Sequence, residues 1–253
     1  MVLPNLTRQI VAPVGLAVVG IAAVAWYVAF LTTDSLMSFT MMPAPLVGPT
    51  EFALFFTLMT TMMIAMMLPA TLPMILGYRQ MLKTKGAVSA GAPANFGTTA
   101  FMAPYILVWG GIGVVALFGL TILGLIGPVV GPAAFVPGVI LIAAGVYQVT
   151  SVKQACLRQC QSPLKFMLGR WRKGLGGAFH MGLYHSLFCV GCCWLFMITL
   201  FVTGAMSLLW MGAVSVMIFV EKVGVKKNYV SRGIGLLLVV LGVAVSTQAF
   251  LTI

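Results

Sequence analysis

One short segment of this chain gathers an imidazole and three thiols. His185 is followed by Cys189, Cys192 and Cys193. Because an α-helix turns by about 100° per residue, the first three of these side chains fall within roughly 60° of one another, and Cys193 lies at the margin of that face. A lone buried cysteine is more typical of packing than of chemistry. Three thiols one turn after a histidine, in an apolar segment where polar groups are costly, favour a metal or redox site.

A second apolar segment carries methionines at helical spacing. These are Met59, Met62, Met63, Met66 and Met67, which follow the i, i+3, i+4, i+7, i+8 pattern of one helix face. Methionine often fills gaps in a core, so packing is the alternative interpretation of this methionine stripe. Thioethers and thiolates together select Cu(I) among the common metals. The stripe and the cysteine face therefore predict a shared copper site.

Two more thiols, Cys156 and Cys160, lie in the most basic segment of the chain. They are four residues apart and would share one face of an interfacial helix. Lys153 and Arg158 would favour the thiolate forms, which suits either metal capture or thiol exchange. The alternative is a membrane-surface helix in which the two cysteines have no chemical role.

Glu221 is one of only three acids in the chain and comes immediately before Lys222. The two could form an ion pair at a helix boundary, or the carboxylate could admit or release a cation at the cytoplasmic mouth of the protein. His180 falls on a different helical face from His185, because the two are five residues apart. We expect His180 at a boundary or in a loop.

The composition indicates which elements position these groups. Of the 253 residues, 61% are hydrophobic and 7% are charged, whereas a soluble domain carries about 25% charged residues. We therefore expect an all-α, polytopic transmembrane helical bundle that forms a single domain over residues 1–253. The net charge of +11 does not indicate nucleic-acid binding, because the basic residues cluster in short segments between apolar ones. That pattern is typical of cytoplasmic loops.

Seven apolar segments approach the ~20 residues that cross a bilayer. They are Ile10–Leu31, Phe52–Leu76, Thr98–Ile122, Phe135–Val152, Gly182–Thr203, Met206–Val220 and Gly233–Leu251. The sixth segment is short and needs a tight turn at Thr203–Gly204. If all seven cross, every Lys and Arg lies on one side together with a cytoplasmic N-terminus, and Thr32–Thr50 and Leu123–Ala134 lie on the other.

Three segments and one dipeptide resemble the signatures of a known family. They are Met62–Pro69, Lys153–Pro163, His185–Trp194 and the pair Glu221-Lys222. Together they are similar to an uncharacterised bacterial and archaeal family of predicted metal-binding integral membrane proteins, and the similarity extends over about residues 52–222. The resemblance implies a multi-pass protein of the inner, cytoplasmic membrane. It also implies that the stripe methionines from Met62 onwards, the five cysteines and Glu221 are the positions to examine; Ser186 departs from the expected glycine.

These observations together favour non-enzymatic binding or handling of a soft transition metal, with Cu(I) first, inside the bilayer. We expect the methionine stripe to meet the cysteine face near mid-membrane, with Cys156 and Cys160 on the cytoplasmic side. Such a protein could load copper into a membrane oxidase or monooxygenase, or act as an accessory subunit of one. Its partners would be the lipid bilayer, the metal ion and other membrane subunits reached through lateral helix contacts.

Four alternatives remain open from the sequence. His185 with three cysteines would also make a closed tetrahedral zinc site, and His185 could instead ligate haem. A membrane thiol–disulfide or quinone-linked oxidoreductase could exchange disulfides between Cys156/Cys160 and Cys189/Cys192, although a reducing cytoplasm disfavours stable disulfides. The last alternative is a purely structural subunit in which the sulfur atoms only pack.

Overall fold

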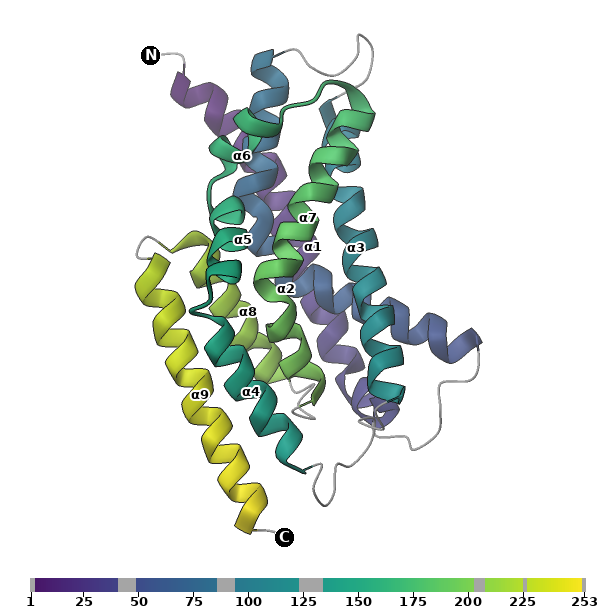
Figure 1. Ribbon diagram of the computed structural model, residues 1–253. Coiled ribbons are helices and arrows are strands. Elements are labelled where there is room, and N and C mark those ends of the chain that lie inside the picture. The colour runs from purple at the N-terminus through teal and green to yellow at the C-terminus, as the bar shows by residue number, and fades with distance from the viewer. Residues whose placement is uncertain are drawn as a thin grey trace.

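The structure is a computed structural model that describes residues 3–40, 49–85, 94–122, 134–202, 208–224 and 227–251. These residues form an all-helical bundle, as the sequence predicts (Figure 1). The helices are α1 (Leu3–Thr40), α2 (Pro49–Lys85), α3 (Ala94–Ile122), α4 (Val136–Tyr147), α5 (Ser151–Gln161), α6 (Pro163–Arg170), α7 (Gly174–Val202), α8 (Leu208–Val223) and α9 (Lys227–Leu251).

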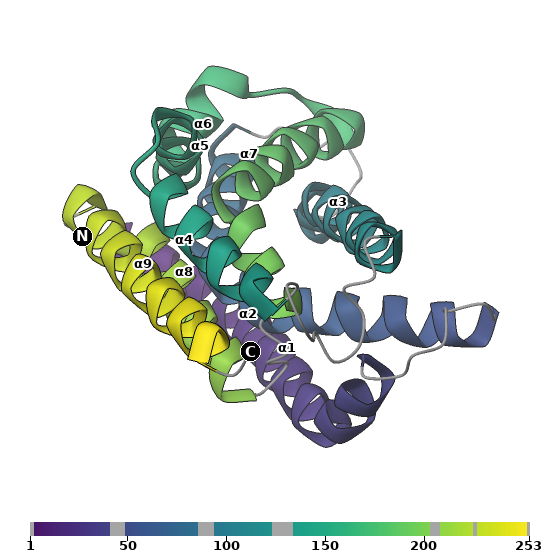
Figure 2. The same cartoon turned by 60° about the horizontal axis from the view of Figure 1, so that its bottom comes forward.

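Helix α7 connects the two halves of the bundle. It packs against α3 on one side and against α4 and α5 on the other, and it also contacts α8. Helix α4 lies along α9, whereas α1 lies along α2, and the two views agree on both pairs (Figures 1 and 2). Residues on α7 can therefore meet side chains from four other helices.

The α4–α9 contact depends on glycines on both helices. A Cβ atom on Gly145 would lie 2.6 Å from the carbonyl oxygen of Gly235, and one on Gly242 would lie 2.7 Å from that of Gly138. Real Cβ atoms essentially never come within 3.0 Å of another heavy atom, so side chains at these positions would clash. The two backbones therefore approach as closely as small residues allow. This close contact anchors α9 against α4, the helix that leads into α5.

Five of the described helices contain stretches long and apolar enough to cross a membrane. These stretches are Pro13–Thr32, Thr60–Leu82, Asn95–Val115, Gly174–Leu200 and Tyr229–Leu251. Helices α4 and α5 would make a sixth if they form one bent span. Helix α8, at 16 residues, is short, as the sequence predicts, and the turn at Thr203–Gly204 lies outside the described residues. A total of seven crossings stays a prediction.

The helix predicted near Phe135–Val152 ends earlier, at Tyr147, and the chain bends by 67° between α4 and α5. Thr150 explains the bend. Its backbone is extended, with φ −68° and ψ 148°, and its side chain accepts a hydrogen bond from the Lys153 backbone N–H, so it caps the beginning of α5. The bend turns the segment that carries Cys156 and Cys160 toward α7.

Candidate metal centre

The thiols of Cys189, Cys192 and Cys193 form a compact cluster on α7. Their sulfur atoms all lie within 4.8 Å of one another, and all three residues are buried. The sulfur atoms of Cys192 and Cys193 are 3.3 Å apart, and the Cys192 thiol also contacts the Cys189 carbonyl oxygen at 3.1 Å. The three cysteines are free thiols. A soft metal ion could bind between them after small side-chain rotations.

A fourth sulfur approaches this thiol cluster from α5. The Sγ atoms of Cys160 and Cys192 are 4.0 Å apart. Cys156, one turn earlier and only partly buried, lies over Gly191, where a Cβ atom would come within 2.7 Å of its Sγ. The absent side chain at Gly191 therefore lets α5 approach α7. The sequence predicts Cys156 and Cys160 on the cytoplasmic side of the α7 cysteines, and in the structure Cys160 lies next to Cys192.

Cys189 contacts two groups that the sequence did not predict at this site. The Lys222 Nζ donates a hydrogen bond to the Cys189 Sγ at 3.0 Å, and the Tyr105 hydroxyl lies 3.2 Å from the same sulfur. Lys222 lies in the last turn of α8 and Tyr105 lies on α3, and both are buried. Helix α3 comes so close because Gly182 has no side chain, since a Cβ there would lie 2.0 Å from the Phe101 carbonyl oxygen. Only the docking of three helices brings these groups together.

The predicted boundary ion pair between Glu221 and Lys222 is wrong. Glu221 binds Lys153 on α5 instead, at 2.8 Å, and both side chains are buried. The same ammonium donates to the Gln148 side-chain oxygen and lies 4.5 Å from the centre of the Phe196 ring. Lys153 is therefore committed to Glu221 and Gln148, so it does not act on the neighbouring thiols. A buried pair of this kind fixes how α5 docks on α8, because separating it would leave a buried charge uncompensated.

His185 is buried one turn before Cys189 but lies among aromatic rings. Its ring centre is 6.1 Å from that of Phe101, 6.2 Å from that of Tyr105 and 5.8 Å from that of Phe166. Neither ring nitrogen has a hydrogen-bond partner among the described residues. Among the described residues, the side chains that lie close enough together to hold one metal ion are the three cysteines of α7, and His185 is not one of them. The four-ligand zinc set with His185 is therefore not assembled in this conformation.

The methionine stripe packs into the same core as the thiol cluster. Met62, Met63, Met66 and Met67 are buried and belong to one continuous cluster of buried residues with Cys189, Cys192 and Cys193. Met59 lies in α2, but its side chain is outside the described set. The stripe thus shares one core with the cysteines, and a direct meeting of the two near mid-membrane stays a prediction.

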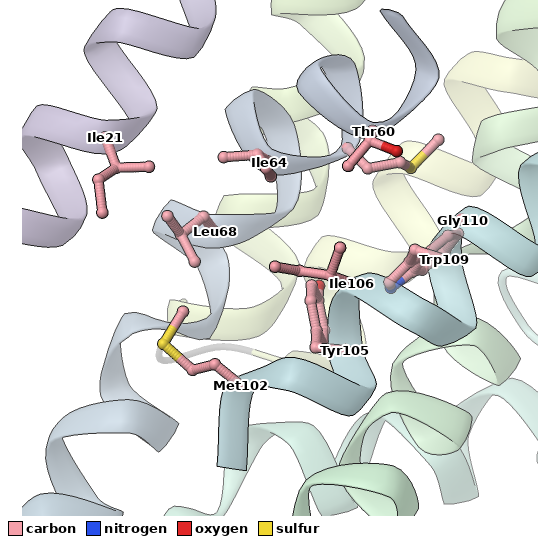
Figure 3. A pocket seen from close by; sticks show the side chains of 10 residues that line it. Ile21, Thr60, Ile64, Leu68, Met102, Tyr105, Ile106, Trp109 and Gly110 are labelled. Atoms are coloured by element: carbon pink, nitrogen blue, oxygen red, sulfur yellow. The ribbon is translucent and has the colours of Figure 1, made fainter. Parts of the chain in front are cut away.

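Met63 also lines an apolar pocket of about 120 Å³ between α1, α2 and α3. Figure 3 shows Ile64 and Leu68 of α2 facing Tyr105 and Trp109 of α3 across this space. Tyr105 forms part of the pocket wall while its hydroxyl contacts Cys189. One aromatic side chain therefore separates the pocket from the thiol cluster.

A comparison with family models finds a match. A model described as PpoB2, copper chaperone, matches residues 56–245. The matched range includes all five cysteines, the buried stripe methionines, Tyr105, Glu221 and Lys222. No curated protein and no solved structure matches the chain.

Proposed function

We propose that this chain, which belongs to the PpoB2 family of copper chaperones, binds Cu(I) at the thiol cluster of α7 and passes it to a copper-dependent oxidase or oxygenase in the same membrane. Family membership makes copper handling the general function. The oxidation state, the ligands and the recipient are our proposal.

The buried group of three thiols is the observation that carries this proposal. Cys189, Cys192 and Cys193 present three sulfur atoms within 4.8 Å, inside an apolar bundle. Thiolate is a soft ligand that favours Cu(I), whereas Mg²⁺, Ca²⁺ and Mn²⁺ prefer oxygen. Burial away from water would also protect Cu(I) from oxidation and exchange.

The cysteines of α5 supply a route into this cluster. Cys156 is partly exposed, Cys160 is buried, and Cys160 lies 4.0 Å from Cys192. A Cu(I) ion could move along these sulfurs by exchanging one thiolate at a time, so that it is never without a soft ligand. Cys156 would make the first contact with incoming copper, and the α7 cluster would hold it.

The test is copper content in the purified full chain. Protein reconstituted with Cu(I) under reducing conditions should hold copper in stoichiometric amount, and X-ray absorption should show a coordination shell dominated by sulfur. Cys192→Ser removes the sulfur common to the cluster and to the Cys160 contact, so it should lose most of the copper. Ser186→Ala, a buried change six residues before Cys192 on the same helix, is the matched control and should keep it. If C192S holds as much copper as the wild type, the thiol cluster of α7 is not the copper site.

A thiol–disulfide oxidoreductase is the second candidate, because the same geometry brings Cys160 and Cys192 close together. Their sulfurs are 4.0 Å apart, and a modest movement would bring them to the roughly 2.05 Å of a disulfide. In that case Cys160 and Cys192 would be found oxidised in protein alkylated directly in cells. The copper proposal expects both to be alkylated as free thiols.

A further inference from the structure

A cavity of about 360 Å³ lies at the corner between α6 and α7, apart from the thiol cluster. It is lined by Gly169, Arg170, Trp171, Arg172, His180, Met181 and Tyr184. Arg170 and Arg172 are positively charged, His180 can become so, and none of the lining residues is acidic. His180, which the sequence placed at a boundary, is thus part of a defined pocket.

Two glycines give this corner its shape. Gly174 has φ 79°, a left-handed conformation that side chains rarely adopt, and it reverses the chain at the beginning of α7. A Cβ on Gly177 would lie 2.8 Å from the backbone of Arg172, so residues 171–173 pack directly on the first turns of α7. The Arg172 backbone N–H also contacts the Met181 sulfur at 3.4 Å. The loop is thereby held against the helix, with Arg172 and His180 facing one cavity.

Arg170 is held in place by stacking. Its guanidinium carbon lies 4.4 Å from the centre of the Tyr184 ring and 5.3 Å from that of Phe188. Stacking on a ring face leaves the N–H groups at the edge of the planar guanidinium free to donate, in a geometry that matches two oxygens of a phosphate. The pocket therefore offers donors that are already oriented.

The chain has little negative charge with which to neutralise this pocket. It contains 14 basic residues and three acids. Glu221 is bound to Lys153. Asp34 lies toward the end of α1 and Glu51 at the beginning of α2, and both of these helix ends lie far from the α6–α7 corner in the two views (Figures 1 and 2). Among the described residues neither arginine forms an ion pair, and both are exposed, so a counter-ion from outside the chain can reach them.

The surroundings of the corner favour a lipid as the source of that counter-ion. Leu164 and Leu168 of α6 and Leu175 and Phe179 of α7 are exposed large apolar side chains beside the basic pocket. Such a mixture of apolar surface, Trp and Tyr with basic residues is typical of the headgroup level of a membrane. We propose that the α6–α7 pocket binds the phosphate of an anionic phospholipid, whose acyl chains cover the neighbouring leucines.

The experiment measures the binding of short-chain phosphatidylglycerol to the detergent-solubilised full chain by native mass spectrometry. Replacing both arginines in R170Q/R172Q should weaken binding about tenfold or more, because charge-assisted hydrogen bonds to phosphate are lost. The matched control is K165Q/K173Q, which removes two exposed charges nearby that do not line the pocket and should bind like wild type. Phosphatidylcholine should bind more weakly than phosphatidylglycerol.

Two results would overturn the proposal. If both double variants bind phosphatidylglycerol equally weakly, the lipid is attracted by the basic surface as a whole and not by this pocket. Displacement of phosphatidylglycerol by inorganic phosphate would make this a site for a soluble anion. If R170Q/R172Q does not fold, R170K/R172K replaces it: this variant keeps the charges but loses the planar donors, so unchanged affinity would also count against the pocket. Copper content is not part of this test, so its failure leaves the proposed function standing.

Discussion

Lys222 places an ammonium group against the sulfur of Cys189 inside an apolar bundle, at 3.0 Å. A buried charge is costly unless it is paired, so this lysine favours negative charge on the thiol it touches. Three thiolates around one Cu(I) carry more negative charge than the metal can neutralise. Lys222 therefore fits a role as the built-in counter-charge of a loaded site, which a set of purely packing cysteines would not need.

Replacing Lys222 with methionine should consequently weaken Cu(I) binding. Methionine keeps much of the length of the lysine stem but removes the charge and the hydrogen bond, which for a charged group contributes about 1.5–3 kcal/mol. We expect the affinity for Cu(I), measured by competition with a chromogenic Cu(I) chelator, to fall about tenfold or more. Lys165→Met, an exposed position on α6, is the control. An unchanged affinity in K222M would mean that the lysine merely fills space.

The sequence predicts the α7 side of the site well, because helical periodicity fixes which residues of one helix share a face. Cys189, Cys192 and Cys193 lie together for that reason. It could not predict Tyr105 or Lys222 at Cys189, because these contacts depend on how α3 and α8 dock on α7. It also missed the pairing of Glu221 with Lys153, since adjacency in the chain suggested Lys222 instead.

At the scale of elements, the bend between α4 and α5 brings the second pair of cysteines to the site. Thr150 gave a local signal, because threonine is a favoured N-cap, but the high hydropathy of the surrounding segment concealed it. Gly191 then allows α5 to approach α7. The sequence predicted a separate interfacial helix that carries Cys156 and Cys160, but it could not predict that the bend packs this helix on α7.

Helix α2 provides the second test of the copper site. Replacing Met63, Met66 and Met67 together with leucine keeps the volume nearly constant, so it should cost under about 1.5 kcal/mol of folding stability per site. If the thioethers bind copper, the triple variant should fold, with a similar thermal midpoint, but hold less copper. Met74→Leu is the matched control, because Met74 is buried on the same helix but belongs to a different core cluster. If the triple variant holds as much copper as the wild type, the methionines of the stripe serve only in packing and do not bind copper.

At the scale of the whole molecule, the basic α6–α7 corner and the positions of the two chain ends predict one orientation of the bundle in the membrane. Helix α1 begins and α9 ends at opposite ends of the bundle, and the α6–α7 corner with its arginines lies at the same end as the beginning of α1 (Figure 1). The positive-inside rule predicts that this end faces the cytoplasm. Copper entering by Cys156 and lipid bound at Arg170 would then both approach from the cytoplasmic side.

This orientation requires an odd number of crossings, and α8 decides the count. Its 16 residues extend about 24 Å, less than the ~30 Å hydrocarbon core, so it crosses only if the bilayer adapts or its ends continue into the flanking segments. A reporter fused after Ile253 tests this. We expect alkaline phosphatase at that position to be active and green fluorescent protein to be dark, because the C-terminus would lie outside the cytoplasm. The control is a fusion after Lys173, at the α6–α7 corner, where the two reporters should behave in the opposite way. A cytoplasmic signal at Ile253 with the control as expected would mean that one predicted helix does not cross.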